Sequence, residues 1–162
     1  MSVYMNYEGI EGETTDANHA GWMDIEHLSW GTSRNISSAS STSTDRESAN
    51  ASITDLNITR SMDSATPALF IESCCGKGKT VIVELCKTGE GSGSDTYMQY
   101  TLTNALISNY TMTGQSDSNA RPVEHITISF QDVEVKYTPY DDDNNALSPL
   151  TVGFDTTTNT KR

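Results

Sequence analysis

The sequence predicts one mainly β domain with a single short helix. Apolar and polar residues alternate along several runs, polar or glycine-rich turns separate these runs, and seven tyrosines and many threonines favour strands over helices. A chain of 162 residues suits one hydrophobic core, so residues 1–162 are expected to form a single domain.

The first predicted strand places Val3, Met5 and Tyr7 on one face, because side chains along a strand alternate between its two faces. The same alternation predicts further strands at residues 51–62, 81–86, 96–112, 126–137 and 150–154. The sequence Thr-Gly-Glu-Gly-Ser-Gly at 88–93 supplies a flexible turn, which predicts a hairpin between two of these strands.

Two segments break the alternation. Between residues 21 and 31 the apolar residues fall on both faces, which predicts a bend near Glu26 or burial against a partner surface. Within 126–137 the apolar positions change from even to odd numbers, so a β-bulge or sharp bend is expected near Gln131 and Asp132. Closed or strongly coiled sheets require such bends.

One helix is expected over residues 64–75. Thr66 is a suitable N-cap, Pro67 suits the first helical position, and Gly76 ends the segment. A helix of this length is marginal alone, so it must pack against the sheet.

Two segments are expected to lack regular structure. Residues 32–50 are predicted to be an extended, exposed loop, because seven of the eight residues from 37 to 44 are serine or threonine and burial cannot offset the entropy of ordering them. A loop of this length serves contacts or is simply flexible, and the sequence leaves both open. The tail at 155–162 is expected to be frayed.

The net charge of −12 argues against two classes of partner. A field of this sign repels phosphate backbones and anionic lipid headgroups, so no nucleic acid is expected. No stretch approaches the about 18 apolar residues that cross a bilayer, so no membrane insertion is expected. The first 33 residues contain neither Lys nor Arg, and no signal peptide is expected. We therefore expect synthesis in the cytoplasm, and a protein of this kind that leaves the cell needs a route that accepts folded protein.

The three cysteines suit a reducing compartment, because they are odd in number and two are adjacent. Cys74 and Cys75 are expected to be small buried apolar residues near the end of the helix. Metal or redox chemistry is the lesser alternative, since no CxxC spacing exists and a zinc site would have to recruit a distant histidine. The histidines are His19, His27 and His125. We therefore expect no metal and no cofactor.

No motif points to an enzyme. Gly78-Lys79-Thr80 ends like a P-loop, but Ser73 stands where the first glycine is needed, and a strand follows where a helix is required. No serine lies in a G-x-S-x-G elbow. We expect no catalytic residues.

Several stretches, taken in order, resemble one family. They are GIEGETTD at 9–16 with His19 and Trp22 after it, LSWG at 28–31, MDSATPAL at 62–69, ALIS at 105–108, ITISF at 126–130 with residues 133–137 following, and VGF at 152–154. Through their order and spacing the chain resembles, over nearly its whole length, the haemolysin-coregulated protein (Hcp) family, the tube subunits of type VI secretion systems.

The resemblance implies a closed β-barrel of two antiparallel sheets with the helix at its side. Six copies would close into a ring, and rings would stack into the inner tube. The partners it implies are further copies of the chain, a contractile sheath, a VgrG-type spike and effector proteins carried in the lumen. It also implies secretion by the type VI system without a signal peptide, and no active site.

A closed ring needs contacts repeated by rotation, and stacked rings need a second surface. We expect the Ser/Thr-rich loop to make contacts between rings or protomers, with its charged residues pairing with opposite charges. The candidate contact residues are Ser37, Ser40, Thr42, Asp45, Arg46 and Glu47, together with Trp30.

Two alternatives remain open. A monomeric β-barrel that binds a small ligand or cargo predicts a single-subunit mass and a cavity inside the barrel. A hydrolase with a Ser/His/Asp set predicts that one histidine substitution abolishes turnover while the fold survives.

Overall fold

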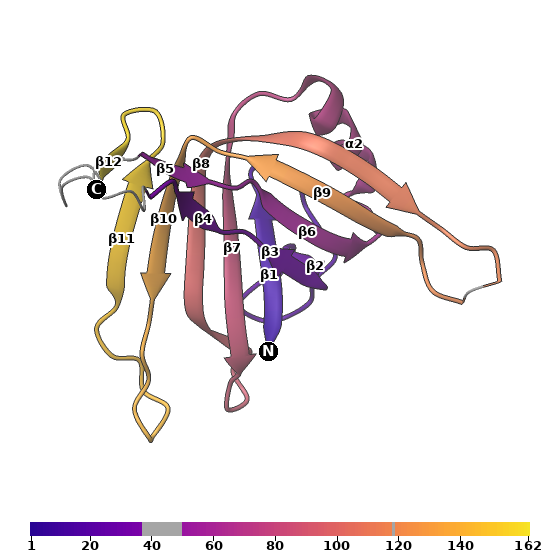
Figure 1. The fold of residues 1–162 in the computed structure, drawn as a ribbon. Helices are drawn as coiled ribbons and strands as arrows, with labels where there is room; N and C mark the ends of the chain where they lie inside the picture. Colours follow the sequence, from indigo (N-terminus) through magenta and orange to yellow (C-terminus); the bar gives the residue numbers. More distant parts are fainter. Residues whose placement is uncertain (37–49, 118) are drawn as a thin grey trace.

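A computed structural model of the chain describes residues 1–36, 50–117 and 119–162. Within these ranges the chain forms twelve strands and the helix α2 (Figure 1). The elements are β1 (Ser2–Tyr7), β2 (Met23–Ile25), β3 (His27–Ser29), β4 (Thr32–Arg34), β5 (Ala51–Ile53), β6 (Leu56–Ser61), α2 (Thr66–Cys75), β7 (Lys79–Thr88), β8 (Ser94–Thr113), β9 (Val123–Ser129), β10 (Asp132–Tyr137), β11 (Leu150–Asp155) and β12 (Thr160–Lys161). The predicted mainly β class with a short helix is confirmed.

The strands form two antiparallel ladders that share β8. One ladder runs β12-β11-β10-β8-β7-β1-β2, and the other runs from β8 through β9 and β6 to β3. Strands β4 and β5 pair separately. No sheet in the described residues closes on itself, so the expected closed barrel is not confirmed.

The two ladders approach each other at Glu26, between β2 and β3. The chain bends there, as predicted, and passes from one ladder to the other. The amide of Glu26 donates to the carbonyl of Thr59 on β6 at 2.8 Å. Strands β2 and β3, on either side of the bend, hold only three residues each. This short extended backbone is too little for β2 to form a ladder with β6.

The second predicted bend, near Gln131 and Asp132, is confirmed. Strand β9 ends at Ser129 and β10 begins at Asp132, and both pair with β8 on either side of Asn104. Asn104 has a φ of 54°, and its side-chain amide donates to Oε1 of Gln131 at 2.9 Å. Both long strands therefore bend at the same level, and that bend joins the two ladders.

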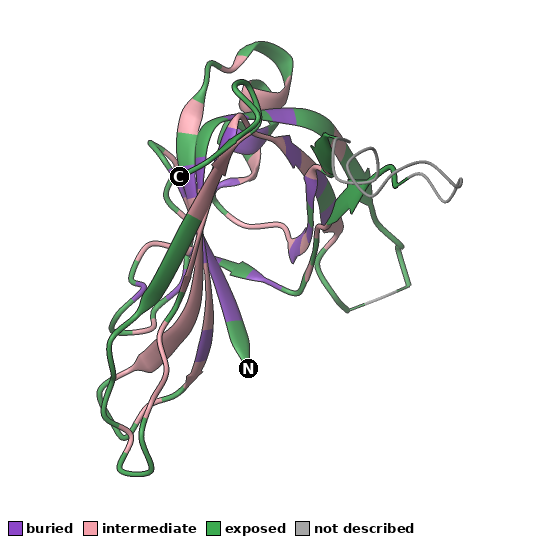
Figure 2. Ribbon diagram, turned by 60° about the vertical axis from the view of Figure 1, so that its left-hand side comes forward, coloured by how far each residue is buried: buried purple, intermediate pink, exposed green. Residues whose placement is uncertain are grey.

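The core lies on one face of the large sheet. In the register of β2, β1, β7, β8, β10 and β11, apolar residues face one another across the strands. Where the second ladder covers this face the side chains are buried, among them Met5, Met23, Val81, Val83, Leu102 and Val133. Figure 2 shows the buried residues gathered in this half of the molecule.

Helix α2 begins differently from the prediction. Its N-cap is Ala65, which offers no side-chain cap, and Thr66 is already helical. The hydroxyl of Thr66 accepts the amide of Asp63 at 3.1 Å and donates to Glu124 Oε1 at 3.0 Å instead. No described helix is long and apolar enough to cross a bilayer.

The expected burial of Cys74 and Cys75 is wrong, because both are exposed. Leu69 is the one buried residue of α2, so the helix contacts the sheet through this side chain. The last turn of the helix, which holds Cys74 and Cys75, points outward.

The predicted frayed tail is also wrong. Strand β12 pairs with β11, and the amide of Arg162 donates to the carbonyl of Gly153 at 2.8 Å. The Arg162 guanidinium binds the carboxylate of Asp132 through two nitrogens, Nε at 2.8 Å and Nη2. This bidentate ion pair raises the pKa of Arg162 and orders the end of the chain. Within the predicted loop at 32–50, residues 32–34 instead form β4, which pairs with β5.

A buried ion pair joins β6 to β9. Arg60 is 1% exposed and Glu124 is fully buried, with Nη1 and Oε1 2.5 Å apart. Asp63 binds the second guanidinium nitrogen at 2.5 Å, and the hydroxyl of Tyr110 donates to Glu124. Burial, followed by these interactions with Glu124, raises the pKa of Tyr110 to about 12.

Glu124→Ala is expected to lower the free energy of unfolding by about 3–5 kcal/mol, because it leaves the buried guanidinium of Arg60 short of a partner. Urea unfolding followed by circular dichroism at fixed protein concentration measures the change. Glu13→Ala is the control, because Glu13 pairs with Arg121 at the surface and its loss is expected to cost less than about 1 kcal/mol. Equal losses for the two variants would contradict this account.

Candidate assembly surface and buried polar cluster

The apolar face of the large sheet continues beyond the core. Along β10 and β11 the cross-strand pairs Val133–Phe154, Val135–Val152 and Tyr137–Leu150 point to the same side. Exposure rises along this series: Val133 is 3% exposed, whereas Val152 is 56% and Leu150 is 69% exposed. The lower ends of β7, β8, β10 and β11 project past β6 and β9, which leaves this part of the face uncovered (Figure 1).

Trp30 lies beside this uncovered face. Its ring makes an edge contact with Tyr100 at 5.2 Å between centroids, and it borders a mainly apolar groove of about 270 Å³. The opposite wall includes Val135 and Val152. We call Tyr137, Leu150 and Val152 the sheet patch, and Trp30 extends it.

A second exposed apolar surface lies on α2 and the far half of β8. Phe70 and Ile71 on the helix are exposed, as is Met112 on β8. Phe70 makes an edge contact with Tyr110, which lies two residues before Met112. We call Phe70, Ile71 and Met112 the helix patch. Figure 1 shows α2 and β11 at opposite sides of the molecule, so the two patches are separate.

The six other predicted contact residues lie outside the described residues, in 37–49. They are Ser37, Ser40, Thr42, Asp45, Arg46 and Glu47. The strands on either side of this segment, β4 and β5, are paired, with Thr32 opposite Ile53. Both residues border the groove beside Trp30. The strands that flank the segment therefore lie beside this groove.

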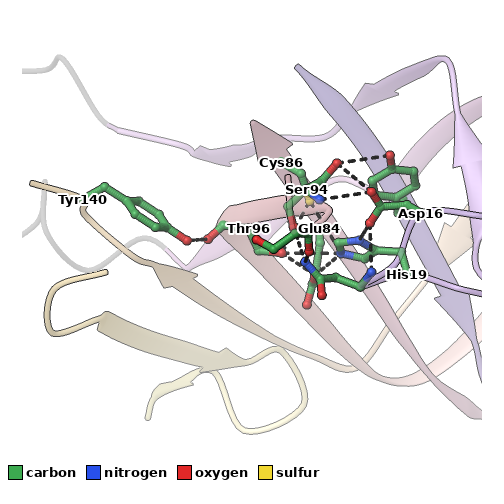
Figure 3. Close-up of polar contacts among 10 residues, drawn as sticks. Asp16, His19, Glu84, Cys86, Ser94, Thr96 and Tyr140 are labelled. Carbon is green, nitrogen blue, oxygen red and sulfur yellow. Dashed lines mark hydrogen bonds and ion pairs between the residues drawn. The ribbon is translucent and has the colours of Figure 1, made fainter. Parts of the chain in front are cut away.

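The opposite, polar face of the large sheet carries a buried cluster around His19 (Figure 3). A turn forms at residues 16–22, in which the carbonyl of Asp16 accepts the amide of His19 at 3.0 Å. The side-chain amide of Asn18 donates to the carbonyls of Ser92 and Ser94. These bonds hold the turn against the β7–β8 hairpin.

Both ring nitrogens of His19 contact a carboxylate. Nδ1 lies 2.7 Å from Asp16 Oδ2, and Nε2 lies 2.7 Å from Glu84 Oε2. Each carboxylate oxygen is a hydrogen-bond acceptor for the ring nitrogen that it faces. The hydrogen bond from His19, with those from Ser94 and Asn18, lowers the pKa of Asp16. The His19 ring stacks on Tyr4 with centroids 4.4 Å apart.

Cys86 and Thr96 complete the cluster. Cys86 Sγ lies 3.6 Å from His19 Nε2 and 3.4 Å from Thr96 Oγ1, which donates to Glu84 at 2.6 Å. Burial raises the pKa of the Cys86 thiol, and nearby carboxylates raise it further. A thiol of this kind is a poor nucleophile, because the thiolate is the reactive form.

Spacing along the chain offers little sign of this cluster. Asp16 and His19 are three residues apart, and Glu84 and Cys86 alternate along a strand, which are common spacings. The pairing of β1 with β7 and of β7 with β8 brings these distant segments together. The fold brings His19 within 3.6 Å of Cys86, a cysteine 67 residues away in the sequence. The structure places His27 and His125 elsewhere, on β3 and β9.

Asp16→Ala is expected to destabilise the turn, because it removes the acceptor of the His19 ring, of the Ser94 amide and hydroxyl and of the Asn18 amide. The free energy of unfolding should fall by about 2 kcal/mol, and amide exchange in the β7–β8 hairpin should accelerate in hydrogen-exchange mass spectrometry. Asp24→Ala, at an exposed position on β2, is the control and should leave exchange there unchanged. Unchanged exchange in Asp16→Ala would show that the cluster does not hold the hairpin.

Comparison with known proteins identifies the family. The family model described as "Type VI secretion system effector, Hcp" matches residues 4–137. Protein hcp1 of Pseudomonas aeruginosa is 27% identical over 139 residues, covering 86% of this chain and 84% of that protein.

Solved structures share the fold. The structure of a type six secretion system protein aligns with a TM-score of 0.89 and 24% identity over 99% of both chains. Hcp1 from Salmonella typhimurium aligns with a TM-score of 0.76 and 21% identity, over 99% of this chain and 98% of its own. With the family model matched along most of its length, the chain belongs to the Hcp family of type VI secretion proteins.

Proposed function

We propose that this chain is a structural subunit of the inner tube of a type VI secretion system. Six copies close into a ring, rings stack into a tube, and the tube is exported. In this role the protein works by shape, with no catalytic residues. Membership of the Hcp family supports the proposal, and the observation that carries it is the apolar face of the large sheet, which extends uncovered beyond the core.

An exposed apolar surface of this kind is costly in a monomer and marks an interaction site. Side chains on β10 and β11 continue the pattern of the core, so a second protein surface laid over them would extend that core. A monomeric ligand-binding barrel needs an enclosed cavity, whereas the groove beside Trp30 opens along the surface of the sheet and is continuous with the sheet patch. A further copy of the chain is the occupant that we propose.

A ring closed by rotation requires two different surfaces on each protomer, because every contact joins the front of one copy to the back of the next. The sheet patch and the helix patch lie on opposite sides of the molecule and are both apolar. We therefore place the sheet patch of one protomer against the helix patch of its neighbour.

Leu150→Glu and Val152→Glu together are expected to convert the ring to a monomer, because they introduce two buried, unpaired charges at each contact. Multi-angle light scattering measures the mass, and electron microscopy of stained particles shows whether six-fold annuli remain. Thr151→Glu is the matched control, since Thr151 lies between the two on β11 and points to the opposite face. Annuli that persist in the double variant, or a single-subunit mass for the unmodified chain at every concentration, would refute the proposed ring.

Mixing two variants tests the head-to-tail arrangement. Ile71→Glu blocks the helix patch, and Leu150→Glu with Val152→Glu blocks the sheet patch. Each variant alone should be monomeric. A mixture of the two should form a dimer and no ring, because one intact sheet patch and one intact helix patch remain to meet.

Thr111→Glu is the control for Ile71→Glu and should leave rings intact, because Thr111 is exposed on β8 and points to the opposite face from Met112 of the helix patch. If Ile71→Glu alone forms rings or dimers, the helix patch is not the second surface. If the mixture stays monomeric, the two patches do not meet.

We further propose that residues 37–47 contact the next ring or a neighbouring protomer, with Asp45, Arg46 and Glu47 pairing with opposite charges. Support comes from the paired strands β4 and β5, which flank this segment and border the groove beside Trp30. Deletion of residues 37–44 should shorten or abolish tubes in electron microscopy while the circular dichroism spectrum of the sheet is retained. Tubes of unchanged length would contradict a stacking role.

The remaining partners follow from the tube role. We propose that a contractile sheath surrounds the tube, that a VgrG-type spike caps it, and that effector proteins travel in its lumen. Co-purification of a tagged effector with rings, and its loss from the Leu150→Glu, Val152→Glu variant, tests carriage in an assembled ring. Equal recovery with the monomeric variant would show that carriage does not need the ring.

A further inference from the structure

We propose that His19, Glu84 and Cys86 form a binding site for a divalent transition-metal ion of the zinc type. The nitrogen, oxygen and sulfur atoms of these side chains all lie within 4.8 Å of one another. Neither tube assembly nor the apolar patches use this cluster, which lies on the opposite face of the sheet.

The spacing of the ligand atoms suits a tetrahedral ion. Bonds of about 2.0–2.3 Å place neighbouring ligand atoms of a tetrahedral zinc ion about 3.3–3.6 Å apart. His19 Nε2 and Cys86 Sγ are 3.6 Å apart, and Thr96 Oγ1 lies 3.5 Å from that nitrogen and 3.4 Å from that sulfur. These three distances therefore already match the spacing between ligands of a tetrahedral zinc ion. The Thr96 hydroxyl, or a water in its place, supplies the fourth ligand.

Two shorter contacts must open when an ion enters. Glu84 Oε2 lies 2.7 Å from His19 Nε2 and 2.6 Å from the Thr96 hydroxyl, because hydrogen bonds hold these atoms together. Each distance would grow by about 0.7 Å to reach the tetrahedral spacing. The Glu84 side chain is 16% exposed, so it has room to make this shift by rotation.

Asp16 provides the outer support that such sites use. A histidine that binds a metal through Nε2 commonly donates its Nδ1 hydrogen to a carboxylate, which fixes the ring and raises its basicity. His19 Nδ1 lies 2.7 Å from Asp16 Oδ2, and the Ser94 amide and hydroxyl in turn donate to Asp16 Oδ1, each at 3.0 Å. The ring is therefore already oriented with Nε2 toward Glu84 and Cys86.

A divalent ion offsets negative charge in the cluster. A bound ion requires a neutral imidazole nitrogen and a thiolate as ligands. With Asp16 and Glu84 as carboxylates and Cys86 as a thiolate, the two positive charges of the ion leave the bound cluster at −1. Thiolate and imidazole ligands favour zinc or cobalt over magnesium or calcium.

Cobalt is the probe for the experiment, because a thiolate bound to Co²⁺ gives a sulfur-to-metal charge-transfer band in the near ultraviolet. The double variant Cys74→Ser, Cys75→Ser keeps Cys86 as its one thiol. Titration of this reduced variant with Co²⁺ should produce the band with one ion per chain, and Zn²⁺ should abolish the band by displacement. Zn²⁺ should also raise the melting temperature, since an ion that binds only the folded state stabilises it.

Further variants assign the ligands. Cys86→Ser should lack the band although it retains Cys74 and Cys75, and Glu84→Gln should weaken Co²⁺ binding. Asp16→Asn should keep the band while lowering affinity about 10- to 100-fold, as expected of a residue that supports a ligand.

Three outcomes would overturn the proposal. The Cys74→Ser, Cys75→Ser variant could give no band, the band could follow Cys74 and Cys75 into the Cys86→Ser variant, or the band could persist after unfolding in urea. The double-serine variant changes only exposed positions, so its result holds even if Cys86→Ser fails to fold.

Discussion

Strand β8 belongs to both ladders, and the positions of the other strands depend on where it bends. Asn104 takes a left-handed backbone conformation in the middle of the strand, and its amide binds Gln131 where the partner strand also turns. Gly78 packs directly against this point, since a Cβ there would lie 1.7 Å from Asn104 Oδ1. One half of β8 can therefore pair with β7 and β10, and the other half with β9, without a break in the chain.

The bend also decides which part of the molecule is covered. The second ladder lies over part of the apolar face and buries residues such as Val83 and Leu102. Farther along β10 and β11 the same apolar face continues without cover. A fold that buried the whole face would need a second ladder as long as the first, and the proposed ring offers a neighbouring protomer in its place.

Alternation in the sequence was sufficient to predict most strands and both bends. The shift from even to odd apolar positions located the turn near Gln131, because a change of face requires a change of backbone direction. The helix was also predicted, but its cap was not, since Thr66 serves Glu124, a residue brought close by the tertiary fold. The ordered tail was missed because its order depends on one long-range ion pair between Arg162 and Asp132.

The candidate sites were harder to predict than the fold. Trp30 was selected from the sequence and does border the exposed apolar face, whereas the patches on β11 and α2 needed the structure. The buried cluster went unrecognised because its members come from distant segments, as for Asp16 and Ser94, which are 78 residues apart. Local spacing cannot reveal such a set, since strand pairing and the docking of the 16–22 turn bring it together.

The joint at Glu26 has a mechanical consequence. In the two ladders, adjacent strands are held by several backbone hydrogen bonds acting in parallel. The gap between β2 and β6 is instead crossed by the backbone bond from Glu26 to Thr59, and the Ser61 hydroxyl donates to the Glu26 carboxylate. A force that pulls the two ladders apart would concentrate at this seam. In the proposed tube, a subunit that is stretched would thus yield first along this seam, and the rest of its wall would keep its shape.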